Sequence, residues 1–188
     1  MFSFNYKFFA LIVFTILCFG FKTNKQVNFL LWKDNRALTW DDFKGKPERR
    51  FAAASTSYDI LKEITINENG STIKIRAVFF FYSSWKKKQW INESVLEHEQ
   101  KHFDIVELYA RKLRKLIKQL KYTSASDLEN KIDSLYDTND KAMDVYQDLY
   151  DEETDGSMNG DKQREWNKKI AEELKTLDTY KVIEVNVK

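Results

Sequence analysis

The sequence predicts an α+β fold in which a small antiparallel sheet comes first and three helices follow. Two β-rich runs flank Asn69-Gly70, and Asn-Gly between apolar runs is the strongest short hairpin signal. From Glu93 onward, apolar residues recur at spacings of three and four, which is the period of a helix buried on one face. A polar break at 124–126 and a polar stretch at 151–160 divide this second half into three helices.

The first half is expected to be extended. Residues 38–45, followed by Pro47, predict a short strand or extended piece that runs into a turn. Residues 52–60 are also expected to be extended. The hairpin then pairs the runs 63–67 and 72–82. Alternate residues of the second run are apolar, so one face of the sheet can be buried.

Three helices are expected to make up the second half. The first covers about 93–121, and its apolar stripe includes both histidines of the chain, so these should face the core. A capping box from Ser126 to Glu129 predicts the start of the second helix. The third is expected at 161–177, and residues 180–187 predict a last strand.

The N-terminus is typical of an export signal. Lys7 precedes an apolar run at 8–19 and the small residue Gly20, which could flank a cleavage site. This run is shorter than the roughly 20 apolar residues of a membrane span. We therefore expect residues 1–20 to be a signal peptide and residues 21–188 to be a single domain in the periplasm or outside the cell. The alternative is an uncleaved anchor, so any membrane contact should run through this segment.

Composition limits the chemistry that the domain can perform. Cys18 is the only cysteine, so the cleaved chain would have no disulfide, thiolate ligand or cysteine nucleophile. The net charge of +2 gives no indication of a nucleic-acid-binding surface, and no nucleic-acid partner is expected. Since the chain has 2 histidines, any metal site must combine them with carboxylates.

Both histidines belong to the pentapeptide HEQKH at 98–102. Residues i and i+4 lie on one face of a helix, so His98 and His102 can share a metal ion. Glu99 between them can point at a metal-bound water and take its proton, as in the HExxH arrangement of zinc metallopeptidases. The simpler alternative is a polar core network that satisfies the buried imidazoles by hydrogen bonds.

A catalytic zinc site needs a third protein ligand. If the second helix returns antiparallel to the first at equal rise per residue, the chain comes level with the motif near Asp148. The acids expected to reach the metal are therefore Asp148, Asp151, Glu152, Glu153 and Asp155. Asp104 and Glu107, on the motif helix itself, are expected to be solvated or packed against the second helix. Tyr146 and Tyr150 are candidate donors to a developing oxyanion, although ordinary packing is the simpler role for each.

Four motifs follow one another along the chain: Leu38-Thr39-Trp40 with Asp42-Phe43-Lys44-Gly45; Ala52-Ala53-Ala54 with Ser84-Trp85; His98-Glu99-Gln100-Lys101-His102-Phe103-Asp104; and Tyr150-Asp151 with Thr154, Gln163 and Trp166. Together they resemble a bacterial family of predicted secreted zinc-dependent proteases (domain of unknown function 922), whose HEQxHFD motif is more specific than HExxH. The resemblance implies a zincin-like metallopeptidase domain, a Zn²⁺ cofactor and a peptide or protein substrate.

The chain departs from the pattern of that family at one position. The family has a histidine two residues after the threonine that corresponds to Thr154, and this histidine would be a natural third ligand. Here the position is Gly156. Either a nearby carboxylate takes its place, most simply Asp155 with Asp151 as the second choice, or the site is weakened.

The sequence therefore favours an exported zinc-dependent metallohydrolase, most simply a peptidase. Its metal ligands would be His98, His102 and Asp155, its general base Glu99, and its oxyanion donor Tyr150. A non-catalytic exported domain, which binds a partner or uses the metal structurally, is the alternative from another functional class.

Overall fold

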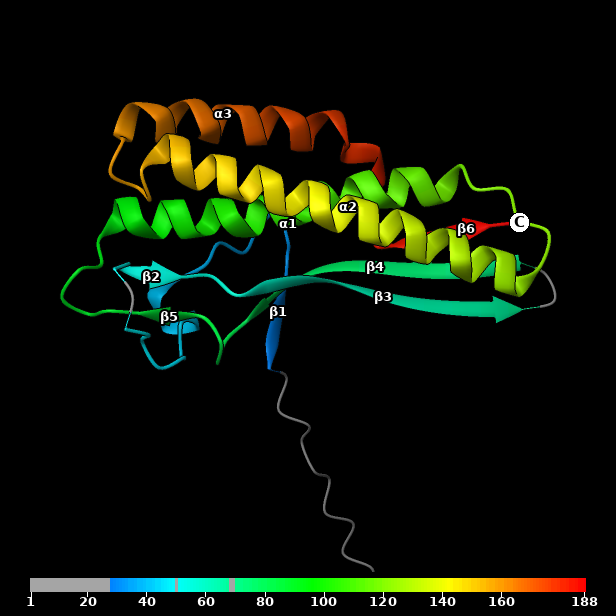
Figure 1. Cartoon of the computed structure of the whole chain (residues 1–188), viewed down its shortest axis with the longest axis horizontal. Helices are drawn as coiled ribbons and strands as arrows, with labels where there is room; N and C mark the ends of the chain where they lie inside the picture. The colour runs from blue at the N-terminus through cyan, green and yellow to red at the C-terminus, as the bar shows by residue number, and fades with distance from the viewer. Residues whose placement is uncertain (1–27, 50, 68–69) are drawn as a thin grey trace, which may run out of the picture.

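The computed structural model describes residues 28–49, 51–67 and 70–188, and it confirms the α+β class (Figure 1). The expected signal segment 1–20 and Asn69 of the hairpin turn lie outside the described residues. The elements in chain order are β1 (Phe29–Leu31), η1 (Trp40–Asp42), β2 (Ala54–Ser55), β3 (Tyr58–Asn67), β4 (Gly70–Phe80), β5 (Trp85–Lys86), α1 (Glu93–Lys118), α2 (Ala125–Thr154), α3 (Gly160–Thr176), η2 (Asp178–Tyr180) and β6 (Glu184–Val187). Among the described helices, none combines the length and the apolar character that crossing a bilayer requires.

Strand β4 is the centre of the main antiparallel sheet. It pairs with β3 along the whole predicted hairpin, while β1 and β6 pair with opposite ends of its other edge. The alternate residues Ile73, Ile75, Ala77 and Phe79 are buried, so one face of the strand forms part of the core. The short strands β2 and β5 form a separate antiparallel pair.

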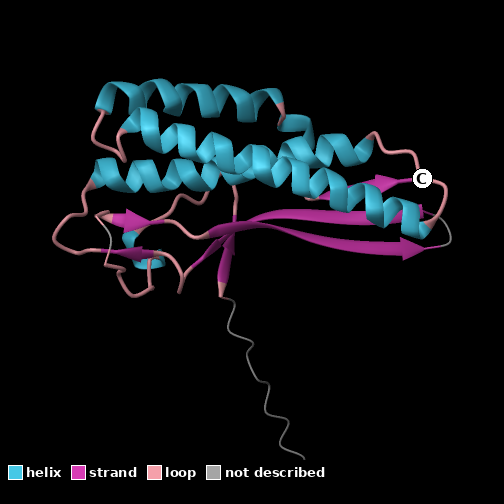
Figure 2. Ribbon diagram, in the orientation of Figure 1, coloured by secondary structure: helices cyan, strands magenta, loops and turns pink. Residues whose placement is uncertain are grey.

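All three helices lie on one face of the main sheet (Figure 2). Helix α1 packs against β4 and also contacts α2 and α3, so it is the central element of the domain. This position explains why every residue from Phe103 to Ala110 is buried, including the acids Asp104 and Glu107. Those two acids are not solvated, and the partners that hold them are described below.

The N-terminal region differs from the prediction. Residues 38–45 were expected to be a short strand or extended piece that runs into a turn; they form no strand, and the turn is the 3₁₀ helix η1, in which Asp42 accepts hydrogen bonds from the backbone and hydroxyl of Thr39. Strand β1 was not predicted. Gly45 approaches another chain segment closely: a Cβ there would lie 2.8 Å from the carbonyl oxygens of Ser84 and Tyr82, so only glycine fits.

The helix ends also differ from the prediction, and one difference bears on the site. Helix α2 begins after Ser124, whose side chain accepts from the backbone N–H of Asp127, and not at the expected capping box of Ser126. It continues to Thr154, so the expected polar loop at 151–160 is shorter by four residues at its start. Asp151 is therefore a helical residue, in the last turn of α2.

Candidate metal centre

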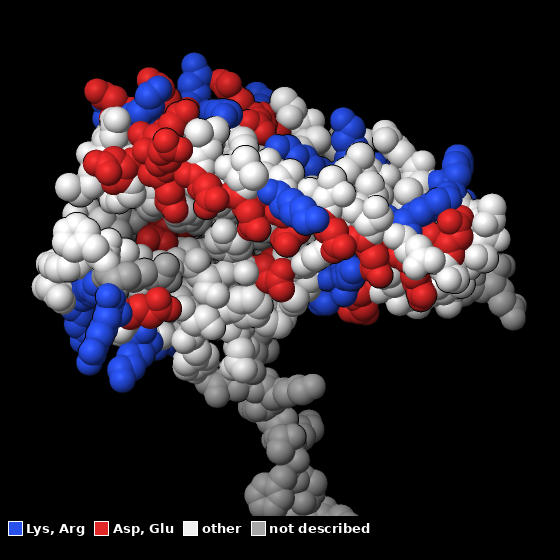
Figure 3. All heavy atoms as spheres, in the orientation of Figure 1, with Lys and Arg blue, Asp and Glu red and all other residues white. Residues whose placement is uncertain are grey.

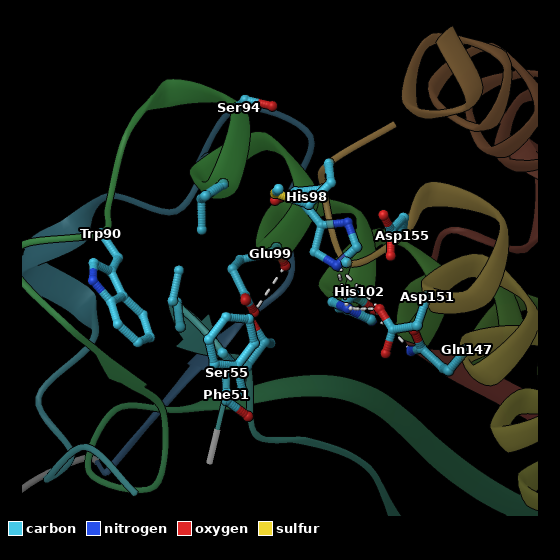
Figure 4. Close-up of a pocket in the computed structure, with 18 of the residues that line it drawn as sticks. Phe51, Ser55, Trp90, Ser94, His98, Glu99, His102, Gln147, Asp151 and Asp155 are labelled. Atoms are coloured by element: carbon cyan, nitrogen blue, oxygen red, sulfur yellow. Dashed lines mark hydrogen bonds and ion pairs between the residues drawn. The ribbon is translucent and has the colours of Figure 1, made fainter. Parts of the chain in front are cut away.

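Three side chains converge where the start of α1 meets the end of α2. His98 and His102 come from successive turns of α1, and their Nε2 atoms lie 3.1 Å apart. Asp151 Oδ1 lies 3.0 Å from each of these two nitrogens. Figure 4 shows the three groups directed toward one another at the side of a pocket. Among the described residues, these three form a group whose ligand atoms could hold one metal ion.

The far nitrogens of both imidazoles are held by glutamine side chains. His102 Nδ1 lies 2.7 Å from Gln147 Oε1, and the Gln147 amide nitrogen donates to the backbone carbonyl of His102, which fixes the orientation of the amide. His98 Nδ1 lies 3.1 Å from Gln163 Oε1, and Gln163 Nε2 donates to Asn167. Since both glutamine oxygens can only accept, both Nδ1 atoms must carry protons.

This tautomer leaves three acceptors facing one another. With both Nδ1 atoms protonated, each neutral imidazole directs the lone pair of Nε2 toward the carboxylate of Asp151. Such a group needs a metal ion or an added proton at its centre. Ligand atoms on a tetrahedral zinc ion at about 2.0–2.1 Å lie about 3.3 Å from one another. The observed separations of 3.0 and 3.1 Å are close to that arrangement, so the donor set fits a small divalent ion with a position left for water.

Without a metal, a proton takes the central position. Burial alone would lower the pKa of His102, but its hydrogen bond to Asp151 and the charges of Asp151 and Glu99 outweigh burial and raise the pKa to about 9. Burial likewise opposes ionisation of Asp151, but the hydrogen bonds and charges of the two histidines hold the pKa of Asp151 well below its usual range. The metal-free site is therefore an imidazolium–carboxylate pair at neutral pH.

Glu99 lies beside this group and is not part of it. Its side chain is 5% exposed, and one carboxylate oxygen accepts a hydrogen bond of 2.6 Å from the hydroxyl of Thr56. Glu99 lines a cleft of about 860 Å³, which His98, His102 and Asp151 also line. The carboxylate is thus held in place by the segment that follows β2 and borders the space in which a substrate could lie (Figure 4).

Asp155, the acid preferred from the sequence as third ligand, is not in the three-residue group. It follows the last residue of α2 in a left-handed conformation with φ of 49°, and it lines the cleft. Asp151 lies beside the two histidines instead, in a part of α2 that extends farther than the sequence predicts. Gly156, where the family resemblance led us to expect a histidine, also lines the cleft, and its φ of 53° strains any residue with a side chain.

Tyr150 does not fit the expected role of oxyanion donor. Its side chain is fully buried behind His98, with ring centroids 4.7 Å apart and the planes nearly parallel. Its hydroxyl contacts the carbonyl oxygen of His98 and the side chain of Gln163, and it is not part of the cleft lining. The geometry makes Tyr150 a residue that positions His98. Tyr146 donates to Glu173 and so faces α3.

The remaining residues of the HEQxHFD segment connect α1 to the N-terminal region. Gln100 accepts from the backbone N–H of Leu38 at 2.6 Å and donates to Asp104 at 2.8 Å. Asp104 also accepts from the indole N–H of Trp32 at 2.9 Å and from Lys101. The bonds from Leu38 and Trp32 fix the rotation of α1 relative to the N-terminal region, and therefore the direction in which the two histidines point.

Several residues that shape the site were not identified from the sequence. Gln163 was noticed on the third helix and in a family motif but not as a partner of His98, and Gln147 and Thr56 carried no signal because their roles depend on contacts between distant segments. Tyr58, which lines the cleft, was also missed. Burial and then the charges of several α2 aspartates raise its pKa, so its hydroxyl keeps its proton and can donate.

A known protein family matches the part of the chain that contains the candidate metal centre. Residues 35–160 match the family described as "Bacterial protein of unknown function (DUF922)". The match covers more than half of the chain and includes the two histidines and Asp151, so the chain belongs to this family. No curated protein and no solved structure matches the chain.

Proposed function

We propose that the protein is an exported zinc-dependent peptidase that uses His98, His102 and Asp151 as metal ligands and Glu99 as general base. The observation that carries the proposal is the convergence of three acceptor atoms beside a held carboxylate and an open cleft. Two imidazoles, one carboxylate and a free position form the ligand set of a catalytic zinc site. Export rests on the N-terminal sequence, as described above.

A zinc ion held by these residues would supply a Lewis acid for the scissile carbonyl and a water of lowered pKa. Glu99 takes a proton from the attacking water as the C–O bond forms, and it delivers a proton to the leaving nitrogen as the C–N bond breaks. The bond from Thr56 holds the Glu99 carboxylate toward the cleft during both transfers. Tyr58 lines the cleft and its hydroxyl stays neutral, so it is the candidate donor to the carbonyl oxygen as that oxygen gains negative charge.

The second candidate is a non-catalytic exported domain whose metal is structural or organises a partner-binding surface. Gly156 favours it, because the family histidine is replaced by a residue that offers no ligand. A metal-free polar network is a third possibility, since a protonated His102 also satisfies the group. The three candidates differ in metal content and in activity.

The test is to measure zinc content and hydrolysis of a labelled unfolded protein by purified wild type and Glu99→Gln. We expect about one zinc per chain in both proteins and a loss of activity of about 10²–10⁴-fold in the variant. Bound zinc without activity in the wild type would support the structural role, and wild-type protein that binds no zinc would support the polar network.

A further inference from the structure

The cleft beside the metal centre has two chemically different ends. One end is formed by the last two turns of α2 and the residues after them, which contribute Asp148, Asp151 and Asp155. The other end is formed by Phe51 and Trp90, whose ring centroids are 5.7 Å apart. Figure 4 shows the two aromatic rings across the pocket from the aspartates, with the metal centre on the aspartate side. The volume of about 860 Å³ lies within the range of ligand pockets, about 300–1,000 Å³.

The aspartate end is negative even with a metal ion in place. Four carboxylates line the cleft, those of the three aspartates and Glu99, and within the described parts of the chain no lysine or arginine lines it. The two charges of a divalent ion therefore leave the cleft with a net charge of about −2 when the histidines are neutral. The acidic side chains of α2 continue away from the cleft, and Figure 3 shows red along this helix above the hollow. A cationic group would be attracted to this end.

The aromatic end favours an apolar group. Phe51 is 99% exposed and Trp90 is 44% exposed, so both rings present apolar surface to solvent. The ammonium group of Lys87 lies 4.5 Å from the centre of the Trp90 ring, which makes this end more positive than the other. A bound cation should therefore choose the aspartate end, and the aromatic end should take a neutral side chain. Glu99 lies between the two ends and borders the cleft.

We propose that the cleft selects an extended peptide that places a lysine or arginine side chain against Asp148 and Asp155 and a large apolar side chain against Phe51 and Trp90. This inference rests on the proposed peptidase function, because it names the substrate class for the same site. The basic residue would lie on the α2 side of the scissile bond. Asp148 and Asp155 are specificity residues, and neither belongs to the three-residue metal group.

The test measures peptide binding to zinc-loaded Glu99→Gln protein, so turnover does not interfere. The probes are fluorescein-labelled peptides that carry one phenylalanine and, at a varied separation, one lysine, norleucine or glutamate. For the best separation, we expect lysine to lower Kd about fivefold or more relative to norleucine, and glutamate to raise it. The preference should weaken with added salt, because exposed charges are screened.

Substitutions in the cleft show which residues produce the preference for the lysine peptide. The double variant Asp148→Asn with Asp155→Asn should bring the lysine and norleucine peptides to equal Kd, and asparagine also tolerates the left-handed backbone at residue 155. Asp137→Asn, on the same helix but outside the cleft lining, should leave the preference unchanged. Trp90→Ala should raise the Kd of all the peptides by the same factor, since each peptide carries the phenylalanine.

The inference would be overturned by equal Kd values for lysine and norleucine peptides, by a lysine preference that survives the double variant, or by absence of binding to every peptide. Hydrolysis of the same peptides by the wild type is measured separately. Cleavage without a charge preference would overturn the inference and leave the peptidase proposal standing. A binding preference without cleavage would support the inference and remove the peptidase.

Discussion

The two ends of α1 both bury polar and charged groups, but they satisfy them in opposite ways. Toward the C-terminal end, Glu107 accepts from Arg111 and from both terminal nitrogens of Arg114. The nitrogens of Arg114 also donate to the backbone carbonyls of Ile75 and Tyr180. Toward the N-terminal end, the two histidines direct acceptor atoms at a third acceptor from α2.

The comparison shows that burial of charge does not by itself indicate a functional site. At the C-terminal end, the Glu107 carboxylate and the Arg114 guanidinium have partners within the protein, so this pair stabilises the packing of α1 on the sheet. In the part of the chain that the structure describes, Nη2 of Arg111 is the one buried donor of this cluster without a hydrogen-bond partner, and a donor does not bind a cation. At the N-terminal end the acceptors outnumber the donors, and the deficit fits a cation from outside the chain. The balance of donors and acceptors is therefore what separates the two regions.

The largest expected effect is the loss of metal binding in His98→Ala or His102→Ala. Zinc at about 1,000 times Kd should stabilise the wild type by about 4 kcal/mol, and the variants should lose this gain because two ligands cannot retain the ion. Thermal unfolding with and without zinc, together with metal analysis, measures it. Lys101→Ala, within the same pentapeptide, is the control that should keep the metal. Stoichiometric zinc in the double histidine variant would end the proposed site.

A substitution in the arginine cluster toward the C-terminal end of α1 should lower the stability of the fold and leave metal binding unchanged. Glu107→Ala leaves two buried guanidinium groups without their shared carboxylate, which should lower the free energy of unfolding by about 3–5 kcal/mol. Zinc content of the folded protein should stay unchanged. Urea unfolding measures the loss, and Glu129→Ala, exposed on α2, should change stability by less than about 0.5 kcal/mol. If Glu107→Ala removed zinc without changing stability, the assignment of a structural role to this cluster would be wrong.

A third comparison separates the two candidate carboxylates at the end of α2. Asp151→Asn should weaken zinc binding by about 100-fold or more, because it removes the charged ligand. Asp155→Asn should change the affinity by less than about threefold, an effect of the size expected for an exposed charge. Competition with a chromophoric zinc chelator gives both values. The opposite order of effects would restore Asp155 as the ligand.

The sequence predicts those parts of the site whose residues are close together along the chain, and it does not predict those that depend on contacts between distant segments. His98, Glu99 and His102 could be grouped because helical spacing alone places them together. The hairpin and the three helices could also be predicted, since their periodicities are local. The third residue of the group depends on whether α2 continues through a polar stretch, and its last turns are contacted from α3, for example by the indole N–H of Trp166, which donates to Glu153. The glutamine partners depend on the register between helices, which no local pattern reports.

A smaller loss of metal affinity is expected when the two glutamines that contact the histidine rings are replaced. Gln147→Leu and Gln163→Leu remove the acceptors that hold Nδ1 of His102 and His98, and such changes typically lower metal affinity by about 10–100-fold. Gln119→Leu, at the far end of α1, is a matched control that should leave the affinity unchanged. The same chelator competition measures these losses. Unchanged affinity in both variants would show that the glutamines do not select the ligand tautomer.

The last prediction concerns pH, and it contrasts the metal-free site with the metal-bound one. In the metal-free fold the pKa of His102 is raised from 6.5 to about 9, so the stability gained from its contact with Asp151 is fully present below pH 6.5 and is lost as pH rises through 9. The pKa of Asp151 is lowered from 3.8, so its share is present above that pH and is lost in stronger acid. With a chelator present, Tm should therefore fall between pH 6.5 and 9.

Zinc should reverse this trend, because the metal needs the unprotonated imidazole of His102. The increase in Tm on adding zinc should grow over the same pH interval, and calorimetry in buffers of different ionisation enthalpy should detect proton release on binding at pH 7. His102→Ala should show neither dependence. A metal-free Tm that rose between pH 6.5 and 9 would mean that His102 is neutral before zinc binds. The metal-free site would then hold no imidazolium–carboxylate pair, and the account of how it satisfies its three acceptors without a metal would be wrong.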